Sequence, residues 1–237
     1  MSQLYFFRHA QASYLADNYD QLSKKGEKQS LELGKYLVQK KLSFDQVFVG
    51  PLQRQQHTCK IVAEHYAQQQ LKMPRPVCLE ALKEHSGPKG VRKVMPELME
   101  RYPQIKQWHL AGKANPQIAK RNSLLVFQKF MNEWVLGNIE VPGIESWADF
   151  RRNVKNALDT ILQQTGKGEQ VAVFTSGGTI SSIIAESLQL ENEQSVAAMN
   201  FSIRNTSFSQ FFYSNQQFNV LSFNELPHLE PDLITFV

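Results

Sequence analysis

Short apolar segments alternate with longer amphipathic segments in both terminal parts of this sequence, and the alternation limits the fold more than any other feature. The apolar segments have strand length and almost no polar positions, as expected of strands buried on both faces. They lie at residues 4–7, 46–49, 76–79 and 170–175. Helical spacing of apolar residues occupies 23–40, 53–69 and 179–188. The pattern predicts an α/β fold of three layers, with helices flanking a mainly parallel sheet.

Two regions depart from this alternation. Residues 207–213 and 218–223 flank Ser-Asn-Gln-Gln and predict an antiparallel hairpin at the C-terminal end. Residues 87–142 are rich in Lys, Arg and Gln and contain no strand pattern, so we expect a helical insertion over the carboxyl edge of the sheet. No linker-like composition divides the chain, and residues 1–237 are expected to form a single domain.

The cationic side chains of the insertion are interpreted mainly as a solvated helical surface. Alternatively, a few of them point down over the sheet edge and meet an anionic substrate. They include Lys89, Arg92, Lys93, Arg101, Lys106, Lys113, Lys120 and Arg121.

The net charge of +4 is mild and fits an anionic small molecule. The chain has no dense Lys/Arg run, so no nucleic-acid partner is expected. Cys59 and Cys78 lie far apart without metal-ligand spacing, which favours a reduced, cytoplasmic protein. The histidines show no ligand-pair spacing, and no metal is expected. A strand begins at residue 4, leaving no room for a signal peptide, and no apolar stretch is long enough for a bilayer.

The first strand ends directly on Arg8 and His9. Open α/β folds bind their ligands at the carboxyl ends of the strands, so this strand brings a guanidinium and an imidazole to the binding edge. An imidazole nitrogen can attack phosphorus and hold a phosphoryl group covalently. A guanidinium can bind two phosphate oxygens at once. With an ordinary pKa of about 6.5, histidine supplies a neutral nucleophilic nitrogen near neutral pH.

Two further polar residues follow later strands. Arg54 lies in the first turn of the helix after the second strand, where backbone N–H groups and the helix dipole favour anions. Glu84 follows the third strand and is a candidate general acid, with Glu80 as its rival at the same edge. Taken alone, each of these is more often an ordinary surface residue.

The fourth strand ends on Ser176-Gly177-Gly178, directly before a helix. Glycines at such a turn let the backbone approach a phosphate closely. The sequence contains neither the Gly-x-Gly-x-x-Gly pattern nor a Lys-bearing phosphate loop, which argues against a nucleotide-binding domain.

In this order, the four segments resemble the histidine phosphatase superfamily, also called phosphoglycerate mutase-like. The resemblance extends over most of the chain and is least specific across the helical insertion. Three further segments match motifs of that family, namely residues 19–26, 143–146 and 204–207.

The resemblance implies a phosphatase that needs no cofactor. His9 would become phosphohistidine, Arg8 and Arg54 would hold the phosphoryl oxygens, and Glu84 would protonate the leaving oxygen and then help to activate water. A mutase is disfavoured, because the family's Glu-Ser run is absent after Arg-His. Two readings of Tyr14 and Tyr19 stay open, as pocket residues or as ordinary surface aromatics.

Two positions depart from the family pattern. Ala10 stands where the family usually has Gly, and Ser176 stands where it has a second His. Loss of one electrostatic donor can lower turnover by about 100- to 1000-fold. We therefore expect a phosphatase with reduced turnover.

Three outcomes of this replacement stay open at this point. Ser176 and the N–H groups of Gly177 and its neighbour form the anion cradle, or His85 or His57 replaces the missing imidazole. In the third, the protein is a weak or inactive phospholigand- or phosphoprotein-binding module. The substrate is expected to be a phosphorylated small molecule or a phosphoprotein. No sequence pattern distinguishes these two or indicates the oligomeric state.

Overall fold

The computed structural model describes residues 1–13 and 20–236, and in this part of the chain six strands form one sheet in the order β3-β2-β4-β1-β5-β6. The strands are β1 (Ser2–Arg8), β2 (Gln46–Val49), β3 (Val77–Cys78), β4 (Gln170–Thr175), β5 (Phe208–Ser214) and β6 (Gln217–Glu225). The first four run parallel, and β5 is antiparallel to both of its neighbours. The predicted mainly parallel sheet with a C-terminal antiparallel hairpin is confirmed.

The register of the two central strands determines which residues meet at the carboxyl edge. Arg8, the last residue of β1, is opposite Thr175, the last residue of β4. The His9 N–H then donates to the Thr175 carbonyl over 2.8 Å. His9 and Ser176 therefore follow adjacent strand ends.

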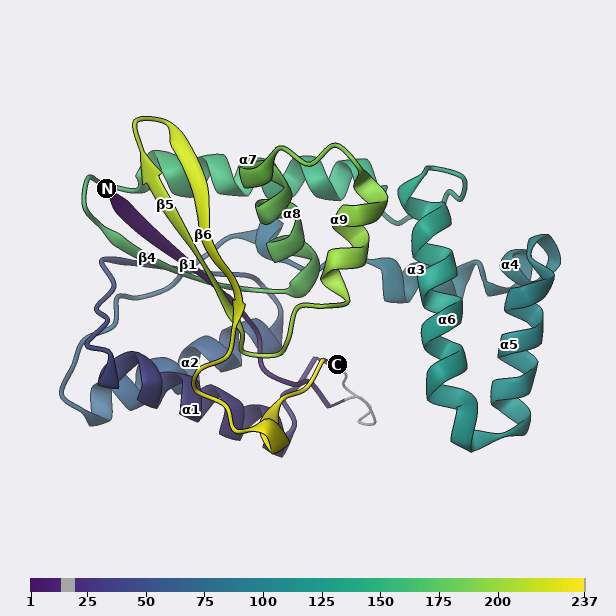
Figure 1. The fold of residues 1–237 in the computed structure, drawn as a ribbon, viewed down its shortest axis with the longest axis horizontal. Coiled ribbons are helices and arrows are strands. Elements are labelled where there is room, and N and C mark those ends of the chain that lie inside the picture. The colour runs from purple at the N-terminus through teal and green to yellow at the C-terminus, as the bar shows by residue number, and fades with distance from the viewer. Residues whose placement is uncertain (14–19, 237) are drawn as a thin grey trace.

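Helices cover both faces of the sheet, as Figure 1 shows. One face is covered by α1 (Lys24–Gln39) and α2 (Gln53–Gln68), and the other by α7 (Trp147–Gln164) and α8 (Gly177–Leu188), with α9 (Glu193–Asn200) beside α8. Alternate residues of β1 enter separate apolar clusters on the two faces. The three-layer prediction is confirmed.

The predicted helical character of residues 87–142 is confirmed over residues 87–135. This region forms α3 (Gly87–Lys93), α4 (Met95–Arg101), α5 (Pro103–Ala114) and α6 (Pro116–Val135). Each of the last three carries Pro in its first two positions, where the missing N–H costs no helical hydrogen bond.

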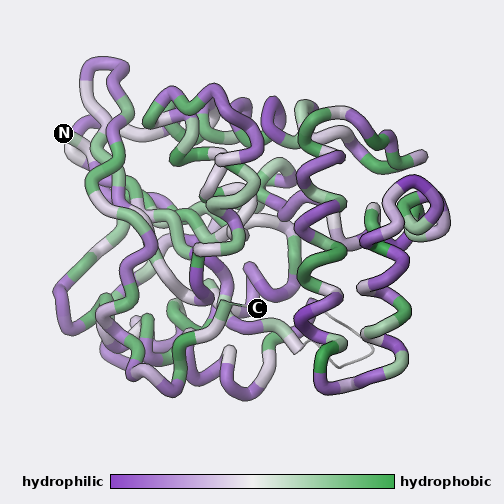
Figure 2. Tube along the Cα trace, turned by 45° about the vertical axis from the view of Figure 1, so that its right-hand side comes forward, coloured by the Kyte–Doolittle hydropathy of each residue, from purple (hydrophilic) through white to green (hydrophobic). Residues whose placement is uncertain are grey.

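The α5–α6 pair stands beyond the ends of β1 and β4 (Figure 1), and its tube alternates between hydrophilic and hydrophobic residues (Figure 2). The cationic residues of the whole insertion are largely solvated, as the composition predicted. The exposed residues are Lys89, Arg92, Lys93, Arg101, Lys106, Lys113, Lys120 and Arg121.

Several element bounds differ from the sequence prediction. β3 is only two residues long, because Pro76 has no N–H to donate to a neighbouring strand. α8 begins two residues earlier than predicted, directly after Ser176. The hairpin turn is tighter than predicted: Asn215 and Gln216 both have positive φ (50° and 62°), which is typical of a two-residue turn. In the described part of the chain, no helix has both the length and the apolar character needed to cross a membrane.

Candidate active site

The His9 imidazole is buried just past the end of β1, and each ring nitrogen has a defined partner. Nδ1 lies 2.7 Å from the Ala10 carbonyl oxygen, and the Arg54 Nε–H donates to Nε2 over 3.0 Å. A carbonyl oxygen can only accept, so Nδ1 carries the proton and the lone pair of Nε2 faces the guanidinium. The contact between His9 and Arg54 joins two residues that are 45 positions apart in the sequence.

Burial and nearby positive charge keep His9 neutral. Burial is the largest cause, and the charges of Arg54 and then Arg8 act in the same direction, so the pKa of His9 lies well below its ordinary value of 6.5. At neutral pH the ring is therefore uncharged, and its lone-pair nitrogen, Nε2, becomes a nucleophile once Arg54 turns to another acceptor.

The backbone around His9 is held by residues to which the sequence analysis gave no role. The Asn205 side-chain amide donates to the His9 carbonyl over 3.2 Å. The Ala10 N–H donates to Thr58 Oγ1 over 3.0 Å, and that hydroxyl donates to the Arg54 carbonyl over 2.7 Å. Asn205 lies in a matched motif, and Thr58 follows Arg54 by four helical residues, so both carried a signal that could have been used.

Arg54 lies in the first turn of α2, as predicted, and is 8% exposed. Its Nη1 pairs with Asp20 Oδ1 at 2.7 Å, and the other Asp20 oxygen accepts from the Gln53 N–H over 2.8 Å. A carboxylate thus occupies the N-terminal end of α2, the place that the sequence analysis assigned to an anion. Asp20 was not predicted as a site residue.

Arg8 lies between the N-terminal end of α8 and the C-terminal segment. Its Nη1 donates to the carbonyl oxygens of Ile203 and Phe236, the latter over 2.7 Å. A Cβ on Gly177 would be 3.6 Å from Arg8 Nε, so the guanidinium runs beside the first N–H of α8. The C-terminal segment is also tied to the site because Asn205 N–H donates to the Thr235 carbonyl over 3.0 Å.

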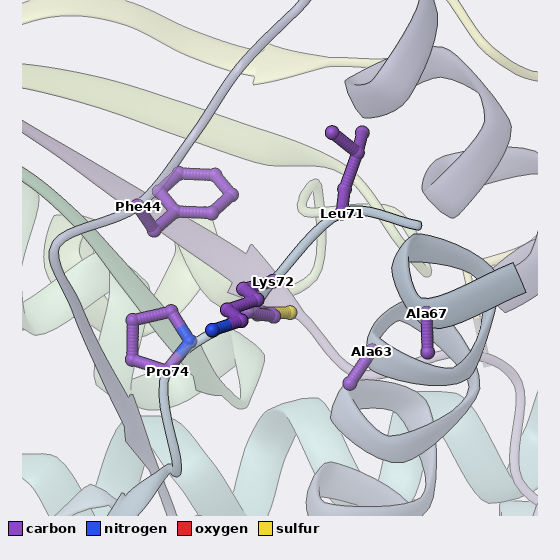
Figure 3. Close-up of a pocket in the computed structure, with 7 residues that line it drawn as sticks. Phe44, Ala63, Ala67, Leu71, Lys72 and Pro74 are labelled. Carbon is purple, nitrogen blue, oxygen red and sulfur yellow. The ribbon is translucent and has the colours of Figure 1, made fainter. Parts of the chain in front are cut away.

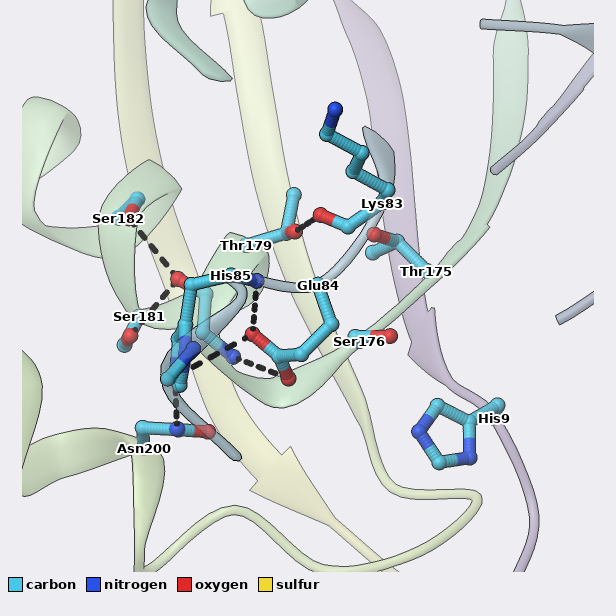
Figure 4. Close-up of polar contacts among 12 residues, drawn as sticks. His9, Lys83, Glu84, His85, Thr175, Ser176, Thr179, Ser181, Ser182 and Asn200 are labelled. Carbon is cyan, nitrogen blue, oxygen red and sulfur yellow. Dashed lines mark hydrogen bonds and ion pairs between the residues drawn. The ribbon is translucent and has the colours of Figure 1, made fainter. Parts of the chain in front are cut away.

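The Glu84 carboxylate is bound to the start of the same helix (Figure 4). Its oxygens accept from the His85 N–H over 2.9 Å and from the Gly178 N–H over 3.1 Å. A Cβ on Gly178 would overlap Glu84 Oε1, so the absence of a side chain here lets the Glu84 carboxylate approach the start of α8. The rival Glu80 is 77% exposed in its side chain and lies near Lys83 instead.

Ser176 is fully buried, and its hydroxyl accepts from Gln55 Nε2 over 2.8 Å. His85 does not share that position: its Nε2 lies 3.5 Å from Glu84 and 3.1 Å from the Asn200 amide, on the side of Glu84 away from His9 (Figure 4). His57 is half-buried on α2, one turn after Arg54.

An aromatic box encloses the His85 ring. The ring centroids of Trp134, Trp147 and Phe150 lie 5.9, 5.9 and 5.6 Å from it. His85 is therefore packed among α6 and α7 while it contacts Glu84.

A shallow groove of about 520 Å³ lies at the other end of α2 from Arg54 (Figure 3). It is lined by Phe44, Ala63, Ala67, Leu71, Lys72, Met73 and Pro74. These side chains offer no phosphate-binding chemistry beyond one lysine. Tyr14 and Tyr19, considered above as pocket residues, lie outside the described residues. Within residues 1–13 and 20–236, no three His, Cys, Asp or Glu side chains are grouped to hold a metal ion.

Comparison with known structures shows relatives of the same fold. They include phosphoglycerate mutase from Bacillus anthracis str. Sterne, with 21% identity, a TM-score of 0.64 and coverage of 96% of this chain and 94% of that chain. Phosphoserine phosphatase from Entamoeba histolytica, in complex with 3-phosphoglyceric acid, has 17% identity, a TM-score of 0.62 and coverage of 97% and 100%. The alpha-ribazole phosphatase from Shigella flexneri has 17% identity, a TM-score of 0.63 and coverage of 94% and 96%.

At these identities the likeness establishes the fold alone. No curated protein matches the sequence. The sequence does match a family model, over residues 4–137 and 127–226, and this match spans every segment described above as contributing to the site except the C-terminal one. The chain belongs to the histidine phosphatase superfamily, branch 1.

Proposed function

We propose that this protein hydrolyses phosphate monoesters through a phosphohistidine intermediate on His9. The contact between Arg54 and His9 is the observation that carries the proposal. It combines a buried neutral imidazole, a fixed tautomer and a guanidinium 3.0 Å from the nucleophilic nitrogen. A phosphoryl group held by that guanidinium has its phosphorus within reach of Nε2.

In the first step, the Arg54 Nε–H turns from Nε2 to a phosphoryl oxygen, the freed Nε2 lone pair attacks phosphorus, and the bond to the ester oxygen breaks. Glu84, in its protonated form, gives its proton to that oxygen, so the alcohol leaves neutral. In the second step, Glu84 takes a proton from water while the water oxygen attacks phosphorus. The phosphorus–nitrogen bond breaks, inorganic phosphate leaves, and both His9 and Glu84 return to their starting forms.

Charge complementarity supports this class of substrate. A monoester carries a charge of about −1.5 to −2 near pH 7. Arg8 and Arg54 bring two positive charges, and the Gly177 N–H adds the positive end of the α8 dipole. Since the site needs only this anionic group, we propose a phosphorylated small molecule as the substrate, in line with the phosphoserine phosphatase and phosphoglycerate mutase among the structural relatives.

Turnover is expected to be reduced, because Ser176 contributes a neutral hydroxyl where an imidazolium would add charge. Charge-assisted hydrogen bonds are roughly twice as strong as neutral ones. A second candidate function follows from Ser176 in place of a second His, together with the Gly178 N–H, which already donates to Glu84 and is not free for an anion. With fewer donors for the transition state, the protein would bind phosphorylated ligands without turnover.

Trapping of the intermediate tests the proposal. The protein is mixed with an aryl phosphate that is radiolabelled on phosphorus and is then quenched in base. Phosphohistidine is stable in base and is hydrolysed in acid. Wild type should therefore retain the label after the base quench and lose it when a second sample is treated with acid. His9→Ala should retain none, and His109→Ala, on α5, serves as the matched control and should label normally.

Label that persists in His9→Ala would refute the assignment of the nucleophile. Phosphate or vanadate binding without label and without released alcohol would establish the binding module instead.

A further inference from the structure

Gln55 is a buried residue of α2 that donates both of its amide hydrogens to the site. Nε2 donates to Ser176 Oγ over 2.8 Å and to the Leu82 carbonyl over 3.0 Å. Its Oε1 accepts from the Leu52 N–H over 3.1 Å, which sets the orientation of the amide. A side-chain amide has two N–H donors, and both are used here. Ser176 Oγ is therefore the acceptor in its contact with Gln55.

The hydroxyl hydrogen of Ser176 must then point elsewhere. Ser176 is the N-cap residue of α8, yet its side chain makes no capping hydrogen bond. Nearby residues place it inside the candidate site: the Thr175 carbonyl accepts from the His9 N–H, and the Gly178 N–H donates to Glu84. Figure 4 shows the Ser176 hydroxyl in the space between the Glu84 carboxylate and the His9 ring.

We propose that Gln55 is a positioning residue that holds Ser176 as a hydrogen-bond donor to the bound phosphoryl group. This inference rests on the proposed function, because it assumes that an anion enters the site beside His9. A hydroxyl is both donor and acceptor and rotates freely. Because the Gln55 amide occupies the acceptor side of the Ser176 hydroxyl, the hydroxyl hydrogen already points toward the anion. Binding the anion then costs less conformational entropy.

The same contact explains why a small residue stands at position 176. An imidazole there would extend into the volume that the Gln55 amide fills. The Gln55 amide also packs closely against Gly50, since a Cβ on Gly50 would be 2.7 Å from Gln55 Cδ. Gly50, Gln55 and Ser176 therefore form one packed set, in which the amide replaces the bulk of a second imidazole and the serine replaces its donor.

A double-mutant cycle separates positioning from general support of the fold. Vanadate affinity is measured by inhibition and by direct titration for wild type, Gln55→Met, Ser176→Ala and the double variant. Hydrogen bonds to charged groups predict that Gln55→Met weakens vanadate binding by about 10-fold or more. In the Ser176→Ala background the same substitution should have no further effect. Gln56→Met is the matched control, because Gln56 is the exposed neighbour on the same helix, and it should bind vanadate as wild type does.

Equal losses in both backgrounds would overturn the inference, since they would show that Gln55 merely supports the fold. Unchanged affinity in Gln55→Met would overturn it as well. In both cases wild type still binds vanadate, so the proposed function stands. Wild type that binds no vanadate and hydrolyses no monoester would refute the proposed function and the inference with it.

A second pair of variants covers the case in which Gln55→Met does not fold. Ser176→His should have a lowered melting temperature, because the imidazole collides with the Gln55 amide. Ser176→His combined with Gln55→Ala should regain that stability and bind vanadate more tightly than wild type. A single Ser176→His variant that is as stable as the pair would contradict the shared volume of these two residues.

Discussion

Gly178→Ala tests whether the start of α8 determines the position of Glu84. The new Cβ would overlap Glu84 Oε1 and would lie 2.6 Å from His85 Cδ2. Carbon atoms in contact are about 3.5–4.0 Å apart, so the groups must separate by about 1 Å. The His85 ring cannot recede, because Trp134, Trp147 and Phe150 surround it. The Glu84 carboxyl, at the far end of a flexible side chain, therefore moves away, and the start of α8 must shift to relieve the contact with His85.

A displacement of about 1 Å in a reacting group costs about 100-fold in rate. We expect kcat for p-nitrophenyl phosphate to fall by about that factor, while vanadate affinity changes little, because Arg54 and His9 are untouched. Overpacking should cost about 1–3 kcal/mol of stability. For a chain of this size that lowers the melting temperature by about 2–4 °C per kcal/mol.

Gly112→Ala is the matched control. Gly112 lies within α5, and a Cβ there would be 3.4 Å from its nearest neighbour, an ordinary contact. Alanine is favoured over glycine in a helix by about 1 kcal/mol, so this variant should be as active as wild type and no less stable. If Gly178→Ala keeps the wild-type kcat with an unchanged melting temperature, then Glu84 is not a proton donor held in place by α8.

Burial lowers the pKa of His228 to about 4, so between pH 6.5 and 4 the unfolded chain binds a proton that the native chain does not. The free energy of unfolding therefore decreases as the pH is lowered through this window, by up to about 1.4 kcal/mol per pH unit. His228→Phe, which keeps the stacking on Phe208, should flatten that slope in urea titrations, and an unchanged slope would show that His228 does not titrate there. Asp20→Asn should tighten vanadate binding by about 3- to 10-fold, because the anion no longer competes with a carboxylate for Arg54; weaker binding would mean that Asp20 orients the guanidinium. Ser23→Ala removes the cap on the Gly26 N–H and should lower the free energy of unfolding by about 0.5–2 kcal/mol, and no loss would exclude a capping role.

The fold could be predicted wherever the pattern was local. β2 and β4 have the bounds that their apolar runs indicated, and Ser23 caps α1 as expected. β3 was overestimated because its length depends on a neighbouring strand and on Pro76, and the start of α8 depends on tertiary contacts of its glycines.

The candidate site could be predicted only in part. Residues that follow strand ends, such as His9 and Ser176, were identifiable because the topology places them at one edge. Gln55 and Asp20 were missed, since their contacts join segments that are far apart in the sequence. The contact between Gly178 and Glu84 could not be predicted either, because only the structure shows which group approaches this glycine. The catalytic roles themselves stay predictions until the variants are measured.

The attachment of Arg8 to the Phe236 carbonyl has a practical consequence for handling the protein. A purification tag fused after Val237 would follow a segment whose Phe236 carbonyl accepts from Arg8, the guanidinium that we propose binds phosphate, and a tag there could compete with substrate. Met1 is 72% exposed and lies at the opposite end of β1, roughly 20 Å from Arg8 for a strand of this length. Kinetic measurements are therefore best made on N-terminally tagged or untagged protein.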